Sequence, residues 1–284
     1  MANLRDIRRR IKSVKNTAQI TRAMQLVAAA KMKKAQDQAL AGREYAEELT
    51  KVLGNIAGGD HELSHPLLRQ RDGKRELVLV ISTDKGLCGP LNTNLSRHYR
   101  EIVPKDAGYV TVGRKLRVYT EKTGGRLLAD FTVKDPVSFS EARAIAKFLT
   151  SQFADGHFDK VTIAYTRFIN TLRQEPDTFT LLPVQPPAAQ PGADGPAGAT
   201  DIGFEPSPAE VLDAILPLYI NYQVYQALLE ARASEHSARM VAMKSATDNA
   251  NKFIKELTLE YNKVRQAAIT AELLEITTAM KAME

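Results

Sequence analysis

Cysteine and long apolar runs are scarce in this sequence, and each scarcity excludes a class of protein. One cysteine, Cys88, among 284 residues rules out an internal disulfide and fits a cytosolic protein. No apolar run reaches the about 18 residues of a transmembrane helix. The first residues, MANLRDIRRRIKSVKN, have no apolar core of a signal peptide. We therefore expect a cytosolic protein without direct membrane insertion.

Proline is missing from both ends of the chain, before Pro66 and after Pro217. Seven of the thirteen prolines fall between residues 183 and 208, where four glycines also occur. That composition is typical of a linker or a long surface loop. Because proline interrupts helices, its absence from the two ends of the chain allows a long helix at each end.

The N-terminal end has the apolar pattern of a coiled coil. Steps of three and four residues from Leu4 to Ile56 meet thirteen apolar residues in sixteen positions. The exceptions are Thr21, Gln25 and Gly42. Gly58-Gly59 can end such a helix. The pattern predicts a single helix over residues 1–58, about 80 Å long.

The C-terminal end repeats this pattern. Ser207-Pro208-Ala209-Glu210 has the form of a capping box with proline at the first helical position. From Ile215 to Ala282 the same steps meet fifteen apolar residues in twenty positions, with no glycine among the residues between them. We expect a helix over residues 207–284, about 110 Å long.

The two predicted helices run antiparallel, because the first leads into the segment between them and the second leads out. The C-terminal helix then outlasts its partner from about residue 265, by about 30 Å. This overhang still carries the apolar residues Ile269, Leu273, Leu274, Ile276, Met280 and Met283. Because a lone helix cannot leave such a face in water, we expect another protein to enclose it.

The middle of the chain alternates strand and helix patterns. Apolar, β-branched runs typical of buried strands occupy residues 76–82, 109–112, 161–165 and 179–184. Helical patterns cover residues 91–103 and 140–153. The alternation predicts a small Rossmann-like α/β domain with a mostly parallel sheet over residues 59–206, ending in the Pro/Gly-rich loop 183–206. The expected fold class is therefore α/β with long helices, in which an antiparallel coiled coil joins this domain.

Positive charge is concentrated at the N-terminal end. Residues 1–35 contain a single acid, Asp6, so they carry a net charge of +9 against +6 for the whole chain. The basic residues are Arg5, Arg8, Arg9, Arg10, Lys12, Lys15, Arg22, Lys31, Lys33 and Lys34. Such a block indicates an acidic partner, which can be nucleic acid, an anionic membrane or an acidic protein surface, although charge alone leaves a solvated helix face open.

Two motifs resemble a metal site and a phosphate-binding turn, and each also has a purely structural interpretation. His61-Glu62-Leu63-Ser64-His65 matches the zinc-protease pattern HExxH, but it lies directly before Pro66, where a helix should end. Ser82–Gly89 follows a strand, where α/β proteins bind phosphates, yet it lacks both GxGxxG and GxxxxGK[ST]. We interpret these motifs as a loop coincidence and a structural turn, and we expect no metal, cofactor or catalytic residue.

Four separated segments of the sequence have a distinctive order. They are Ile11–Met24 with Val27–Met32, the turn STDKGLCG at Ser82–Gly89, SEHSARMVAMKSATDN at Ser234–Asn249, and YNKVRQAAITAELLE at Tyr261–Glu275. In this order they resemble the gamma subunits of rotary ATP synthases. In one departure, Ala279-Met280 occupies the place of the family's usual Gly-Ala pair.

This resemblance implies a central-stalk rotor subunit without a catalytic site of its own. The coiled coil would fill the cavity of a ring of alternating alpha and beta subunits. The sheet domain and the lower shaft would contact the epsilon subunit and the membrane rotor ring of c subunits. Ion-driven rotation would then change the conformation of the catalytic beta subunits, and the chain would take part in regulating ATPase activity. The implied location is the cytoplasmic face of the bacterial inner membrane.

Candidate interface residues come from the charge pattern and from the resemblance. Basic residues away from the apolar seam, which can meet acidic segments of the ring, are Arg8, Arg9, Lys12, Lys15 and Arg22. The resemblance places Met24 near the lever segment of the beta subunits. It also places at the contact between shaft and ring the residues Arg239, Arg265, Gln266, Thr270 and Glu275.

Two other classes of protein fit the sequence less well. A coiled coil that binds nucleic acid would have base-stacking aromatic side chains in its basic block, and residues 1–35 contain none. We therefore expect no nucleic-acid partner. A free-standing α/β enzyme would need a phosphate loop or an acid/base pair, and the sequence shows neither.

Overall fold

The computed structural model describes residues 4–57, 65–71, 73–104, 106–185 and 207–283. This part of the chain contains six helices and five strands. None of these helices has the length and apolar character that crossing a membrane requires. The chain divides into two compact units, residues 1–29 with 239–284 and residues 30–238, which are described in turn.

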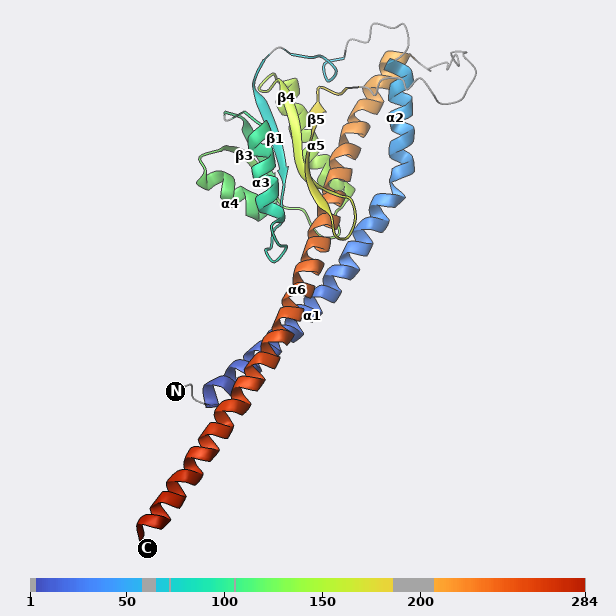
Figure 1. Cartoon of the computed structure of the whole chain (residues 1–284). Helices are drawn as coiled ribbons and strands as arrows, with labels where there is room; N and C mark the ends of the chain where they lie inside the picture. The colour runs from blue at the N-terminus through green and yellow to red at the C-terminus, as the bar shows by residue number, and fades with distance from the viewer. Residues whose placement is uncertain (1–3, 58–64, 72, 105, 186–206, 284) are drawn as a thin grey trace. The chain divides into compact units, whose positions relative to one another are not determined.

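The first unit is an antiparallel helix pair. In it the part of α1 (Leu4–Ala41) up to Ala29 lies beside the part of α6 (Pro208–Met283) from Arg239 onward (Figure 1). The predicted seam is confirmed. Its buried side chains are Ile7, Ala18 and Ala28 from α1 and Met243, Ala250 and Leu257 from α6.

Two polar exceptions in the seam face each other. The hydroxyl oxygens of Thr21 and Thr247 are 2.7 Å apart and both side chains are buried. Each hydroxyl also lies within hydrogen-bond distance of a carbonyl of its own helix, that of Ala18 for Thr21 and that of Met243 for Thr247. The pair therefore satisfies two polar groups that burial would otherwise penalise.

The overhang of α6 is present as expected. Its six apolar side chains are between 49% and 90% exposed. Within the described part of this unit, α6 is exposed at every residue from Ile269 to Met283. The helix therefore presents an apolar face that its partner helix does not cover.

The single helix predicted over residues 1–58 is wrong, because it is interrupted at Gly42. There α1 ends at Ala41 and α2 (Arg43–Ala57) begins, with a visible bend (Figure 1). The Tyr222 hydroxyl donates a hydrogen bond to the Gly42 carbonyl oxygen. Because that contact takes the carbonyl and glycine is a weak helix former, the helix breaks at this residue. Gly58-Gly59, the predicted end of the helix, lies outside the described residues.

The second unit contains a five-stranded sheet in the order β3-β2-β1-β4-β5. Its strands are β1 (Glu76–Ile81), β2 (Gly108–Val112), β3 (Arg126–Phe131), β4 (Lys160–Phe168) and β5 (Gln174–Leu182). All neighbouring pairs are parallel except β4 and β5, which confirms the mostly parallel sheet. Strand β3 escaped prediction, because as an edge strand it is only partly buried and carries charged residues.

Helices cover both faces of the sheet. They are α3 (Leu91–Ile102), α4 (Arg114–Lys122) and α5 (Phe139–Ala154). Alternate residues of β1 point to opposite faces: Leu77 and Leu79 pack with α5 and the N-terminal part of α6, and Val78 and Val80 pack with α3 and α4. Burial on both faces explains the unbroken apolar run of β1.

Helix starts agree with the cap signals in the sequence. The Glu210 backbone N–H donates to the Ser207 hydroxyl oxygen at 3.3 Å, as the predicted capping box requires. At the start of α5, Ser138 and Glu141 form a complete capping box. Helix α5 begins and ends within one residue of the predicted helix over residues 140–153.

Candidate subunit-interface site

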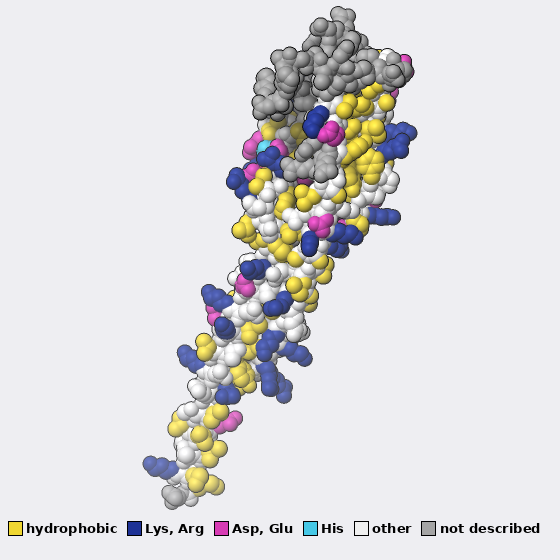
Figure 2. Space-filling view, turned by 90° about the vertical axis from the view of Figure 1, so that its right-hand side faces the viewer, with side chains coloured by type: hydrophobic (Ala, Val, Ile, Leu, Met, Phe, Trp, Pro, Cys, Tyr) yellow, Lys and Arg dark blue, Asp and Glu magenta, His cyan; other side chains and the backbone are white. Residues whose placement is uncertain are grey.

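A basic groove runs between α1 and α6 in the first unit. It encloses about 640 Å³, with Arg5, Arg8, Arg9, Ile11, Lys12 and Lys15 from α1 and Thr258 and Tyr261 from α6 as its lining. No acidic side chain is among these residues. Figure 2 shows Lys and Arg side chains gathered along the paired helices. The groove therefore presents concentrated positive charge beside two hydroxyl groups.

The structure brings four of the five predicted basic residues together. Arg8, Arg9, Lys12 and Lys15 all line the groove, whereas Arg22 is exposed further along α1. Arg9 forms an exposed ion pair with Asp6 at 3.2 Å. An exposed pair of this kind contributes little to stability, so most of the positive charge stays available to a partner.

The residues taken from the family resemblance do not form one cluster. Met24 and Arg239 are half-buried, whereas Arg265 is exposed. Three others, Gln266, Thr270 and Glu275, are exposed on the overhang of α6. Arg239 is separated from Arg265 by about 40 Å along this helix. If these residues contact partners, they do so at separate places.

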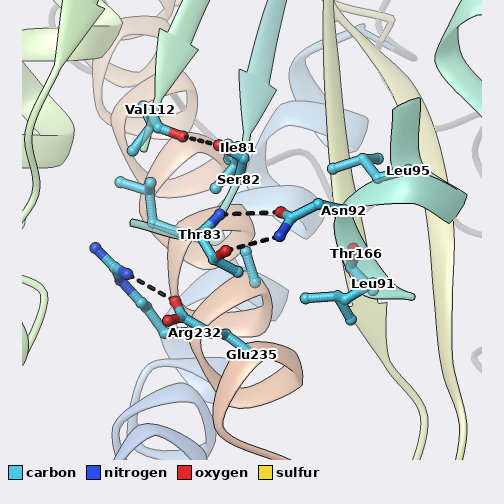
Figure 3. Close-up of a pocket in the computed structure, with 12 residues that line it drawn as sticks. Ile81, Ser82, Thr83, Leu91, Asn92, Leu95, Val112, Thr166, Arg232 and Glu235 are labelled. Atoms are coloured by element: carbon cyan, nitrogen blue, oxygen red, sulfur yellow. Dashed lines mark hydrogen bonds and ion pairs between the residues drawn. The ribbon is translucent and has the colours of Figure 1, made fainter. Parts of the chain in front are cut away.

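The turn Ser82–Gly89 is held by hydrogen bonds to Asn92 of α3 (Figure 3). The Thr83 backbone N–H donates to the Asn92 side-chain oxygen at 3.2 Å, and the Asn92 amide donates to the Thr83 hydroxyl oxygen at 2.8 Å. Leu87 and Gly89 adopt positive φ angles of 64° and 61°. The cavity behind the turn measures about 10 Å³, room for one water molecule, whereas ligand pockets usually exceed about 300 Å³.

A short polar segment of α6 meets this turn. Arg232 donates to the Glu235 carboxylate at 2.7 Å, to the Val133 carbonyl at 2.8 Å and to the Asp84 carboxylate at 3.3 Å. Figure 3 shows Arg232 and Glu235 pointing toward each other beside Thr83. Burial lowers the pKa of Arg232, but the charges of Glu235 and Asp84 outweigh it and raise that pKa overall. The guanidinium group therefore stays charged although it is buried.

The next residues of α6 extend this set of contacts. The Ser234 hydroxyl donates to the Thr166 carbonyl at 2.9 Å, and the Ser237 hydroxyl donates to the Thr171 carbonyl at 2.7 Å. His236 lies 3.2 Å from the Asp135 carboxylate.

Asp135 also joins α1 to this set. It accepts a hydrogen bond from the Lys31 ammonium group at 2.7 Å. Burial raises the pKa of Asp135, but the hydrogen bond from Lys31 and the charge of His236 outweigh burial and hold the pKa below its ordinary value. Asp135 is therefore a charged link between α1, α6 and the loop that follows β3.

Comparisons with known proteins all indicate the same family. The family model described as ATP synthase matches residues 3–283. An ATP synthase gamma chain from Akkermansia muciniphila is 50% identical and covers 100% of both chains. One from Opitutus terrae is 50% identical over 98% of each chain. The chain belongs to the ATP synthase gamma chain family. The resemblance inferred from four segments is thereby confirmed along nearly the whole length.

Solved structures agree with this fold. In the central stalk and c-ring structure of the Tetrahymena thermophila mitochondrial ATP synthase, one chain is 27% identical with a TM-score of 0.62. The alignment covers 80% of this chain and 99% of that one. A chain of the Euglena gracilis mitochondrial ATP synthase shares the fold with a TM-score of 0.71 at 22% identity, over 99% of this chain and 94% of that one.

The family assignment gives a context for the contacts that sequence reasoning missed. The segment Ser234–Asn249 resembles gamma subunits in sequence, but that resemblance does not predict its contacts with the sheet. The available signal was a cluster of polar residues, because Arg232, Ser234, Glu235 and Ser237 lie close together in α6 and all four are buried. Buried polar side chains require partners, so such a run predicts a bonded contact with another element.

The HExxH motif is only partly described. His61–Ser64 lie outside the described residues. The His65 Nδ1 atom accepts a hydrogen bond from the Leu67 backbone N–H at 3.1 Å, and its Nε2 atom lies 3.2 Å from the Asp213 carboxylate. These contacts occupy both ring nitrogens and give His65 a structural role between the loop and α6.

Proposed function

We propose that this chain is the central-stalk rotor subunit of an ATP synthase. It couples ion-driven rotation of the membrane ring to conformational change at the catalytic beta subunits, and it carries no catalytic site itself. The observation that carries this proposal is 50% identity over the full length to gamma chains, combined with the exposed apolar overhang of α6. A helix with such a face requires an enclosing partner, which the ring of alpha and beta subunits supplies.

The basic groove supports the same assignment. Its cations are exposed in the chain alone, and acidic segments of surrounding subunits would compensate their mutual repulsion. In this role residues 1–58 and 207–284 form the shaft. Residues 59–206 form the domain that meets the epsilon subunit and the c ring, and through the epsilon subunit the chain takes part in regulating ATPase activity. The complex is then peripheral on the cytoplasmic face of the bacterial inner membrane.

Direct observation of rotation tests this function. Lys122 is exposed at the end of α4, and Cys88 is buried, so Lys122→Cys in a Cys88→Ser background gives one accessible attachment point. Complexes of alpha, beta and this chain, fixed through the beta subunits, would carry a gold rod at residue 122. We expect rotation in one direction that requires ATP. ATP hydrolysis with a stationary rod would contradict the rotor function, and complexes bearing only the Cys88→Ser change control for non-specific attachment.

A further inference from the structure

The α6 segment from Arg232 to Ser237, called here the polar collar, differs from the rest of the helix that packs on the sheet. Earlier in α6, the contacts are mainly apolar, through residues such as Leu216, Ile220 and Val224. In the polar collar, Arg232, Ser234 and Ser237 instead bond to the sheet unit, and all are buried. The second unit ends at Ala238, one residue beyond the collar.

The contacts of the polar collar reach the ends of several strands. Arg232 bonds to Asp84, in the turn after β1, and to the Val133 carbonyl, in the loop after β3. Ser234 bonds to the carbonyl of Thr166, in β4. Ser237 bonds to the carbonyl of Thr171, in the connection from β4 to β5, and accepts a bond from Gln174. One helical segment is thereby tied to four of the five strands or to their adjoining loops.

Directional bonds resist a motion that apolar contacts tolerate. Apolar burial depends on area and not on orientation, so a helix can turn or slide on an apolar surface with little change in buried area. A guanidinium group bonded to fixed acceptors loses its bonds when the helix turns. A rotor needs this property wherever torque passes between its sheet domain and its shaft helix.

We propose that Arg232 is the positioning residue that locks α6 to the sheet domain, so that torque passes between them without slip. Asp84 and the Val133 carbonyl receive its bonds, and Glu235 keeps its charged group in place. Ser234 and Ser237 hold the neighbouring turns of the helix. This inference rests on the rotor function proposed above and assigns a place on the chain where torque is transferred.

The test compares pumping with hydrolysis under load. Arg232→Met with Glu235→Gln removes the bonds of Arg232 to Asp84 and to the Val133 carbonyl, and the second change avoids a buried Glu235 carboxylate without its arginine. The bonds of Ser234 and Ser237 remain. Asp84→Asn is a milder second variant, because the pair of Arg232 with Glu235 stays intact. Arg117→Met is the matched control, since Arg117 pairs with Asp130 at 3.0 Å within the sheet domain. Each variant would be assembled into the complete ATP synthase and reconstituted in vesicles.

We expect all variants to hydrolyse ATP and to pump ions normally when no gradient opposes pumping. Against an imposed ion gradient, the ratio of ions pumped to ATP hydrolysed should fall about 10-fold for the double variant, because the loss of one charge-assisted bond shifts an equilibrium by about that factor or more. The fall should be smaller for Asp84→Asn and absent for Arg117→Met.

Three outcomes would overturn the inference. The ratio of the double variant could match that of the parent under load. Hydrolysis and pumping could decline together in proportion to lost assembly, which would indicate a merely structural role. Arg117→Met could behave like the double variant. A parent complex that neither rotates nor pumps would instead refute the rotor function itself, so the two failures are distinguishable.

Discussion

At Gly42, the absence of a side chain lets the Tyr222 ring lie against the backbone where α1 ends. A Cβ atom there would lie 2.6 Å from the Tyr222 hydroxyl oxygen and 3.3 Å from a ring carbon. Alanine normally favours a helix over glycine by about 1 kcal/mol, but this clash would cost more. The local packing thus decides whether the substitution of Gly42 by alanine raises or lowers stability.

We predict that Gly42→Ala lowers the free energy of unfolding of the full-length chain by about 1–2 kcal/mol. Tyr222→Phe removes the clashing hydroxyl. The double variant should therefore be more stable than the sum of the two single effects implies, as measured by urea unfolding with circular dichroism. Strict additivity of the two substitutions would show that the contact at Gly42 does not limit stability.

Asp159 and Arg75 give the sheet domain a pH-dependent contact. The Arg75 guanidinium donates to both carboxylate oxygens of Asp159, at 3.0 and 2.8 Å, and the Arg75 backbone N–H donates as well. The hydrogen bonds from Arg75 hold the pKa of Asp159 below its ordinary value. Because the folded-state pKa is lowered, this contact stabilises the fold fully above about pH 4 and less as the pH falls through the folded value.

We predict that Asp159→Asn lowers stability at pH 7 and reduces the loss of stability that acid causes in the parent. Urea unfolding of the full-length chain at pH 7 and at pH 3 measures both effects. Asp155→Asn, which changes an exposed carboxylate nearby, is the control. An equal loss of stability on acidification in the parent and in Asp159→Asn would rule out the linkage.

At the scale of elements, we expect the overhang of α6 to contribute to assembly with other proteins and not to the folding of the chain alone. Its apolar side chains have no covering partner in the described part of the chain, so they add little to the stability of the chain alone. Enclosure by another protein would bury them. The same residues should therefore matter for retention in a complex and not for the sheet.

Removing residues 266–284 should leave the sheet signal in circular dichroism unchanged and weaken retention of the chain in the alpha–beta ring, measured by gel filtration. Leu273→Ser with Ile276→Ser in the full-length chain tests the apolar face without shortening the helix. Loss of sheet structure in the truncated chain would place the overhang in a folding core, contrary to this geometry.

At the scale of the whole molecule, the positive charge of α1 favours binding to an acidic partner. Arg9 and Lys12 lie in the basic groove beside other cations, and their mutual repulsion destabilises the isolated pair of helices. Partly desolvated charge pairs are worth about 1–4 kcal/mol each, whereas exposed pairs contribute much less. An enclosing acidic surface would therefore make these cations favourable to assembly.

We predict that Arg9→Glu with Lys12→Glu leaves the helix content intact but impairs assembly or the coupling of hydrolysis to ion pumping. ATP hydrolysis and ATP-driven pumping would be measured in complexes of matched subunit content. Lys33→Glu with Lys34→Glu changes the same charge on α1 outside the groove and serves as control. Parental assembly, hydrolysis and pumping in the Arg9/Lys12 variant would mean that the groove is a solvated face.

Much of this architecture could be read from local patterns in the sequence. The apolar seams of the two helices, the buried strand β1 and the cap at Ser207 each depend on residues close together in the chain. Their spacing alone predicts the structure, because periodicity reports which face is buried. Four separated segments similar to gamma subunits then sufficed to identify the family.

Only the tertiary structure decided the features that depend on residues far apart in the sequence. The break at Gly42 requires Tyr222, and the lock at Arg232 requires Asp84 and Val133. Edge strand β3 is held by pairing with β2, and the composition of β3 alone does not predict a strand. A buried polar group or a glycine shows in sequence that some partner must exist, but chain topology selects which one, because only folding brings the two together.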